Sequence, residues 1–210
     1  MGATDWHEWH RSYDDPASSL SQRLVVVGRR IGDALDLLGA GCERILSLCA
    51  GDGRDVLPEL ASRPACRPAS VRLVELDPVL ADGARRRAEE LGLPGVDVVV
   101  GDAGDRRTFD DVLPVDLLLL CGVFGNVVDA DIRTTLQAAA AMVRPGGCLV
   151  WTRGRFEHGD LRPEVRRWSV DAGFIELAFD GEPAPYGVGL YRNDRPGSRS
   201  LPDRLFTFVR

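Results

Sequence analysis

Two glycines in a short loop, and two carboxylates after later apolar runs, are the residues of this sequence best suited to bind a ligand. Residues 44–60 read RILSLCAGDGRDVLPEL, so an apolar run meets Gly51 and Gly53 before a helical pattern begins. Glycine lets the backbone approach a ligand closely, and the first N–H groups of a helix favour an anion. Glu75 ends a second apolar run in VRLVELDP, and Asp102 follows a third in VVVGDAGD.

Two ligands suit such a loop, a dinucleotide and an amino acid joined to a nucleoside. The dinucleotide fingerprint G-x-G-x-x-G requires a third glycine, but Val56 stands at that position. An amino-acid–nucleoside needs a tight turn and a carboxylate for its ribose, and Glu75 offers two oxygens for the two hydroxyls. We expect Leu76 to form an apolar shelf for adenine. Asp102 is then expected to accept from the adenine amino group, and the N–H of Ala103 to donate to the ring.

The elements that position these residues follow from the alternation of short apolar runs with helical stretches. Fully apolar strands separated by helices predict a parallel sheet covered on both faces. Asp77 followed by proline predicts the capped start of one helix. The predicted strands are residues 45–49, 71–75, 96–101, 115–121 and 148–152, and the predicted helices are residues 54–61, 79–91, 106–112 and 130–143.

The two ends of the chain complete this α/β pattern. Ser19 and Gln22 predict a capping box at the start of a helix within residues 18–41, which carries an apolar stripe and is ended by Gly39 and Gly41. Asp160 is expected to cap a late helix that ends at Gly173. FIELAFD and RLFTFVR then read as strands, and YGVGLYR between them is a further strand candidate. Successive strands without a helix between them predict an antiparallel edge of the sheet.

Composition narrows the class of protein. The 210 residues suit one domain, the net charge is −6, and every one of the 26 basic residues is arginine. An acidic chain disfavours a nucleic-acid partner. We expect no membrane partner and a cytoplasmic location, because neither a long apolar segment nor a signal peptide is evident. The five cysteines predict reduced thiols, and no metal site is expected.

Five fragments in order resemble the class I S-adenosylmethionine-dependent methyltransferases: ILSLCAGDGRD, VELDP, GDAGD, VDLLLLCGVFGNV and MVRPGGCLVW. The resemblance implies a Rossmann-like three-layer sandwich with a seven-stranded, mostly parallel sheet of order 3-2-1-4-5-7-6, whose last strand is antiparallel. It implies S-adenosylmethionine as cofactor, S-adenosylhomocysteine as product, and in-line methyl transfer to an O- or N-nucleophile of a small molecule. The cofactor-binding residues are then Ser47, Cys49, Ala50, Gly51, Gly53, Glu75, Leu76, Asp102, Ala103, Cys121, Gly122 and Phe124.

The sequence departs from this family at two positions. The family usually has an acidic residue where Ser47 stands and a glycine where Cys49 stands. Ser47 retains hydrogen bonding but forms no charge pair with the methionine ammonium group. Phe124 admits two interpretations, one beside the sulfonium and one as a core residue.

Residues 1–41 are expected to form an N-terminal arm and cap helix over a methyltransferase domain of residues 42–210. The arm is interpreted either as a lid or as a surface arm that packs its tryptophans on the domain. Tyr13 and Arg23 are candidates to close over the cofactor carboxylate. If the acceptor requires a general base, the candidates are His158, His10 and Asp14.

Two alternatives to this enzyme remain open. One is a non-catalytic nucleoside-binding or partner protein with a degenerate methyltransferase fold, which Ser47 and Cys49 favour. The other is a nicotinamide-dependent oxidoreductase, which Val56 disfavours. A monomer or a homodimer is expected in either case.

Overall fold

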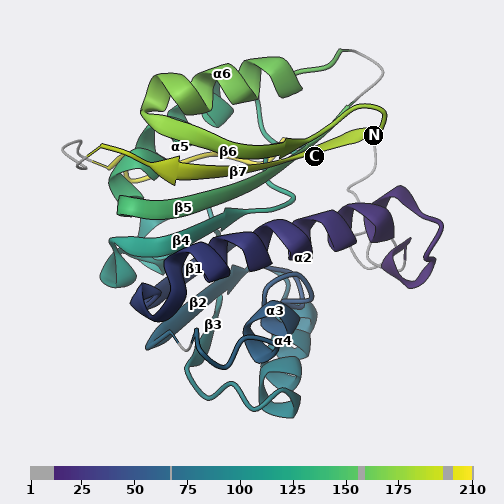
Figure 1. The fold of residues 1–210 in the computed structure, drawn as a ribbon, viewed down its shortest axis with the longest axis vertical. Helices are drawn as coiled ribbons and strands as arrows, with labels where there is room; N and C mark the ends of the chain where they lie inside the picture. The colour runs from purple at the N-terminus through teal and green to yellow at the C-terminus, as the bar shows by residue number, and fades with distance from the viewer. Residues whose placement is uncertain (1–11, 67, 156–158, 196–200, 210) are drawn as a thin grey trace.

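The structure is a computed structural model that describes residues 12–66, 68–155, 159–195 and 201–209. These residues form a seven-stranded sheet of order β3-β2-β1-β4-β5-β7-β6 (Figure 1). The strands are β1 Arg44–Leu48, β2 Ser70–Glu75, β3 Val96–Val100, β4 Val115–Leu120, β5 Val143–Gly154, β6 Phe174–Asp180 and β7 Tyr186–Asn193. The helices are α2 Ser19–Leu38, α3 Leu57–Ala61, α4 Pro78–Glu90, α5 Asp129–Met142 and α6 Arg162–Ala172, with short 3₁₀ turns η1 Ser12–Asp14, η2 Gly39–Gly41, η3 Arg106–Thr108 and η4 Asp110–Val112.

The order and direction of the strands confirm the predicted sheet. Strands β1 to β5 pair in parallel, whereas β7 is antiparallel to both β5 and β6. The prediction that RLFTFVR forms a strand is wrong, because the seventh strand, β7, is the other candidate and consists of Tyr186–Asn193. Residues 201–209 instead bond to loops of the domain: Leu205 donates its N–H to Gly104, and Val209 donates its N–H to Asn126. Because the backbone of residues 201–209 bonds to these loops and not to a neighbouring strand, the segment forms isolated β-bridges, from Arg204 to Asp105 and from Phe208 to Val127.

The main differences from the predicted helices are at the starts of α2 and α3 and in residues 106–112, which form the two 3₁₀ turns η3 and η4 instead of one helix. Ser18 precedes α2 in an extended conformation and accepts from the N–H of Ser21, so the cap lies one residue before the predicted Ser19. Helix α3 begins at Leu57 and not at residue 54, with a proline in its first turn. The prediction for Asp77 is confirmed, since its carboxylate accepts from the N–H groups of the first turn of α4.

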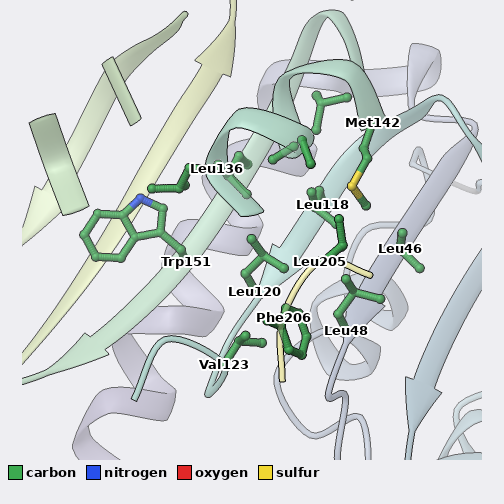
Figure 2. Close-up of a cluster of buried hydrophobic side chains, with 14 of the residues drawn as sticks. Leu46, Leu48, Leu118, Leu120, Val123, Leu136, Met142, Trp151, Leu205 and Phe206 are labelled. Atoms are coloured by element: carbon green, nitrogen blue, oxygen red, sulfur yellow. The ribbon is translucent and has the colours of Figure 1, made fainter. Parts of the chain in front are cut away.

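Helices cover both faces of the sheet and divide the core into two clusters. Helices α2, α3 and α4 pack on one face, and α5 and α6 pack on the other together with residues 201–209 (Figure 1). Figure 2 shows part of the second cluster, in which Leu205 and Phe206 lie among side chains from β1, β4, β5 and α5. None of the helices in the described ranges is long and apolar enough to cross a membrane.

A buried carboxylate on β4 fixes the start of β1. One oxygen of Asp116 accepts from the backbone N–H groups of Glu43 and Arg44 at 2.8 and 2.7 Å, and the other accepts from the guanidinium of Arg144. The Asp116 side chain is 6% exposed, so water does not readily replace these partners. The contact holds β1 in register beside β4, and both strands lead into loops of the site described below.

We expect Asp116→Ala to lower the free energy of unfolding by about 2–4 kcal/mol, because two backbone N–H groups and the Arg144 guanidinium lose their buried acceptor. Urea unfolding followed by circular dichroism measures this change. Asp82→Ala is the matched control: Asp82 pairs with Arg85, both side chains are largely exposed, and an exposed pair contributes below about 1 kcal/mol. Equal losses in the two variants would contradict the assigned role of Asp116.

Candidate functional site

The loop after β1 turns sharply because three of its residues adopt left-handed backbone conformations. The φ angles are 60° at Cys49, 57° at Gly51 and 69° at Gly53. A Cβ atom at Gly53 would lie 2.7 Å from the Leu57 side chain, so Gly53 is required for the loop to pack against α3. Cys49 carries a side chain in a conformation that favours glycine, and such strain is concentrated at functional sites.

Glu75 connects this loop to the end of β2. Its Oε2 accepts from the N–H of Gly51 at 2.7 Å, and its Oε1 accepts from the N–H of Asp77 at 2.9 Å. The residue is 9% exposed and lines a cavity. A carboxylate has about four lone-pair positions, so each oxygen retains an acceptor position for a ligand.

The cavity has a volume of about 350 Å³ and lies at the carboxyl ends of β1 to β4, where open α/β sheets bind ligands. Helix α2, the preceding turn and Phe208 complete its wall. Eleven of the residues predicted from the sequence line it together: Tyr13, Arg23, Cys49, Ala50, Gly51, Glu75, Leu76, Asp102, Ala103, Cys121 and Gly122.

Other predicted site residues do not line this cavity. Ser47 is buried within β1, and Gly53 packs against α3. Phe124 is buried with its ring centroid 6.2 Å from that of Trp151, which supports the core interpretation over a place beside a ligand. Asp14 is exposed in η1. His10 and His158 lie outside the described residues.

The cavity also contains polar residues that the sequence analysis did not select. These are Asp52, Arg54, Asp55 and Asn126. The Asn126 amide donates to the carbonyl of Gly122 at 2.8 Å and so holds the loop after β4. The position of Asp55 in the sequence could have indicated that it lies at the cavity. It follows Gly53 by two residues, just before the helical pattern begins.

The two aspartates of the loop differ in their partners. Asp52 accepts from Arg54 at 2.8 and 2.7 Å and pairs with Arg87 at 3.1 Å. Burial raises the pKa of Asp52, but the two guanidinium groups outweigh it and hold the pKa below its usual range. Burial raises the pKa of Asp55 to about 6, against hydrogen bonds from its own N–H and that of Val56. Asp55 Oδ1 is buried and accepts no hydrogen bond from any described residue.

Tyr13 closes the cavity beside α2. The Arg54 guanidinium carbon lies 4.6 Å from the centre of the Tyr13 ring, and Arg23 donates to the Tyr13 hydroxyl at 3.1 Å. Burial raises the pKa of Tyr13, although the charge of Arg23 opposes this, so the phenol is neutral at physiological pH. The turn that carries Tyr13 is fixed to α2, because Ser21 donates its hydroxyl to the Tyr13 carbonyl.

The two cysteines of the cavity are neutral thiols at physiological pH. Burial, with the nearby charges of Glu75 and Asp102, raises the pKa of Cys49 well above its usual range. Burial and the Asp55 carboxylate do the same for the pKa of Cys121. A thiolate is the nucleophilic form of cysteine, so these side chains contribute surface and not a nucleophile.

The far end of the cavity is formed where residues 201–209 cross the loop after β3. Arg204 donates to Asp102 Oδ2 at 2.8 Å, and the N–H of Gly104 donates to Oδ1 at 2.8 Å. Both side chains of the Arg204–Asp102 pair are about half exposed, at 48% and 44%. The pair therefore holds the loop while leaving Asp102 accessible from the cavity.

Comparison with known proteins identifies the domain type. Residues 45–147 match the family model described as a methyltransferase domain. This match contains the glycine loop, Glu75, Asp102 and the loop after β4. A search of curated proteins finds no match to the chain.

Three solved structures with similar folds illustrate the range of relatives. An O-methyltransferase family protein from Burkholderia thailandensis is 18% identical with a TM-score of 0.62, over 88% of this chain and 62% of that one. An O-methyltransferase family 2 protein from Planctomyces limnophilus, in complex with apigenin, is 19% identical with a TM-score of 0.62, over 83% and 60%. An RNA methyltransferase from Salinibacter ruber, in complex with S-adenosyl-L-homocysteine, is 20% identical with a TM-score of 0.55, over 84% and 95%. The chain thus spans about three fifths of the length of the two O-methyltransferases.

The raised pKa of Asp55 predicts how stability depends on pH. Because folding raises this pKa from about 4 to about 6, the charged form is disfavoured in the folded chain. The resulting loss of stability is absent below about pH 4 and complete above about pH 6. We therefore expect Asp55→Asn to raise the Tm by several degrees at about pH 7.5 and by progressively less as the pH falls to 4.

Differential scanning calorimetry of the ligand-free protein at a series of pH values tests this expectation. Asp171→Asn, which alters an exposed residue on α6, is the matched control and should show no such trend. A Tm difference for Asp55→Asn that stays constant between pH 4 and 7.5 would show that Asp55 titrates normally.

Proposed function

Because this chain is a class I S-adenosylmethionine-dependent methyltransferase by its fold and by the domain model that residues 45–147 match, we propose that it transfers a methyl group to a small-molecule acceptor. The observation that carries the proposal is the Glu75 carboxylate, which the Gly51 N–H holds at the edge of the cavity with acceptor positions to spare. S-adenosylmethionine is the cofactor of this class and supplies an activated methyl group on a positively charged sulfur.

The residues of the cavity fit that cofactor. A volume of about 350 Å³ lies within the range of about 300–1,000 Å³ that is usual for small-ligand sites. Glu75 accepts from the ribose hydroxyls, and Leu76 forms an apolar surface beside adenine. Asp102 accepts from the adenine amino group on an oxygen that it shares with its present donor. The N–H of Ala103 donates to the adenine ring.

The chain contributes to methyl transfer mainly by position and by the exclusion of water. The leaving group is a neutral thioether, so little charge has to be stabilised on it. Tyr13 and α2 close the cavity on one side, and the loop after β4 forms the side next to Cys121 and Gly122. An acceptor that approaches between these two walls is separated from bulk water.

A small-molecule acceptor fits the charge of the chain and the form of the cavity. The net charge of −6 disfavours binding to a nucleic-acid backbone. The apigenin complex of the Planctomyces limnophilus protein shows that the same fold accommodates a planar phenolic compound. The Salinibacter ruber enzyme acts on RNA, so RNA is the second acceptor class to test.

The cofactor is tested first by calorimetric titration with S-adenosylhomocysteine, with NAD as the comparison ligand. We expect micromolar binding of S-adenosylhomocysteine and none of NAD. Glu75→Ala should weaken that binding by about 1–3 kcal/mol, as expected for the loss of hydrogen bonds to a charged acceptor. Glu89→Ala, at an exposed position of α4, is the control and should bind as the wild type does.

Circular dichroism of Glu75→Ala must show a folded chain, because Glu75 also accepts from two backbone N–H groups. Unchanged affinity in a folded Glu75→Ala variant would place the ribose elsewhere. Binding of NAD in preference to S-adenosylhomocysteine would replace the proposal with an oxidoreductase.

The acceptor is tested by transfer of a radiolabelled methyl group from S-adenosylmethionine to pooled small phenols, catechols and amines, and separately to total RNA. Label on the small-molecule pools supports the proposal. Label on RNA alone would overturn the acceptor class. Binding of S-adenosylhomocysteine without turnover on any pool would favour a non-catalytic nucleoside-binding protein.

A further inference from the structure

Two of the five cysteines lie against each other, away from the cavity of the candidate site. A hydrogen bond joins the thiols of Cys42 and Cys66, although the glycine loop and α3 lie between these residues in the sequence. All five cysteines are free thiols. Cys49 and Cys121 line the cavity, and Cys148 lies on β5. The thiol pair of Cys42 and Cys66 is therefore a cluster of reactive groups that methyl transfer does not use.

The backbone fixes both members of the thiol pair at the amino edge of the sheet. Cys42 precedes β1 and Cys66 precedes β2, and each donates its N–H to a carbonyl three residues earlier, at 3.2 and 2.9 Å. The N–H of Ser70 donates to the carbonyl of Glu43 at 3.0 Å, which joins the segment before β2 to the segment before β1. The two thiols thus meet as a consequence of the pairing of β1 with β2.

Cys66 is the member of the pair that small reagents reach. It lines a second cavity of about 160 Å³, which lies between the end of α3 and the loop that joins α4 to β3. Cys42 is buried in the core cluster to which α2, α3 and α4 contribute. An outer thiol in contact with an inner one is the arrangement that a two-step exchange reaction requires.

Hydrogen bonding and charge also make Cys66 the more acidic thiol of the pair. Burial raises the pKa of both thiols. For Cys66, the hydrogen bond with Cys42 and the positive charge of Arg63 oppose that rise, whereas for Cys42 the same hydrogen bond adds to it. The thiolate is the nucleophile in thiol–disulfide exchange, so Cys66 is the first of the two to react.

We propose that Cys42 and Cys66 are a redox modification site, which forms a disulfide with a small-molecule disulfide such as oxidised glutathione as the oxidant. The deprotonated sulfur of Cys66 attacks one sulfur of the oxidant, whose S–S bond breaks and releases one thiolate. The deprotonated sulfur of Cys42 then attacks the sulfur of Cys66 and releases the second thiolate. The protons of the two cysteines pass to the two released thiolates, and the electron pair that the cysteines lose reduces the oxidant.

The new bond closes a covalent loop around the segment that carries the glycine loop and α3. A cross-link of this kind restricts the unfolded chain and so stabilises the folded one. The thiol pair lies at the amino edge of β1 and β2, whereas the cavity lies at the carboxyl ends of the same strands. We therefore expect oxidation to raise thermal stability and to leave the affinity for S-adenosylhomocysteine unchanged.

Oxidation of the full chain in glutathione buffers tests the site. The protein is equilibrated at a series of ratios of oxidised to reduced glutathione, the remaining thiols are blocked by alkylation, and linked peptides are identified by mass spectrometry. We expect one intramolecular link, between the peptides that carry Cys42 and Cys66. The Tm should rise by about 5–10 °C, and dithiothreitol should reverse the rise.

Three variants separate the two steps of the exchange. Cys42→Ala should accumulate the mixed disulfide of Cys66 with glutathione, because the second step has no attacking thiol. Cys66→Ala should form no link at Cys42 and should show no rise in Tm on oxidation. Cys148→Ala, which removes a buried cysteine outside the pair, is the matched control and should form the same link as the wild type.

An oxidised wild-type protein in which both Cys42 and Cys66 are alkylated would overturn the inference. A link from either residue to Cys148 would also overturn it, because the contact between the two thiols would not be the one that reacts. A mixed disulfide that persists on Cys66 of the wild type would show that Cys42 does not reach it. The inference does not depend on the proposed function, since a protein that binds no S-adenosylhomocysteine still gives or fails to give the link.

Discussion

The site depends on one carboxylate that joins three elements. Glu75 ends β2, accepts from Gly51 in the loop after β1, and accepts from Asp77 at the start of α4. Neither backbone N–H has a partner within its own helix or strand, so the carboxylate satisfies both donors while remaining in the cavity. The left-handed conformation of Gly51 allows its N–H to point at Glu75. Loop conformation and ligand site are therefore consequences of the same interaction.

The acidic residues near Glu75 differ in how far the protein neutralises them, and this difference decides what each of them does. Asp52 and Asp55 are three residues apart in one loop, yet the first is neutralised by two arginines and the second has a buried oxygen without a donor. An acid that is satisfied within the protein stabilises the loop. A buried acid without a hydrogen-bond donor lowers the stability of the folded chain. Binding sites often carry such a cost in stability.

The residues at the strand ends were predictable from the sequence. Each of Gly51, Glu75 and Asp102 follows or ends an apolar run that predicts a strand, and the carboxyl ends of parallel strands lie at one edge of the sheet. The last strand was only a candidate in the sequence, YGVGLYR, which the structure confirms as β7. YGVGLYR contains two glycines, which argue against a strand. In the structure, a Cβ atom at Gly189 would lie 2.9 Å from Trp151, so glycine makes room for a large aromatic side chain. The partners of Asp55 also depend on contacts in space, which spacing along the chain does not reveal.

The two ends of the cavity differ in how strongly they can select a ligand. Asp102 and Arg204 are about half exposed, so water competes for their hydrogen bonds and the pair contributes little free energy. Asp55 has a buried oxygen without a donor, and a hydrogen bond made there would be stronger than one made in water. The segment that carries Arg204 is nevertheless anchored, because Leu205 and Phe206 belong to the same core cluster as β1 and β4 (Figure 2). The end of the cavity at Asp102 is thus shaped mainly by packing, and the end at Asp55 mainly by charge.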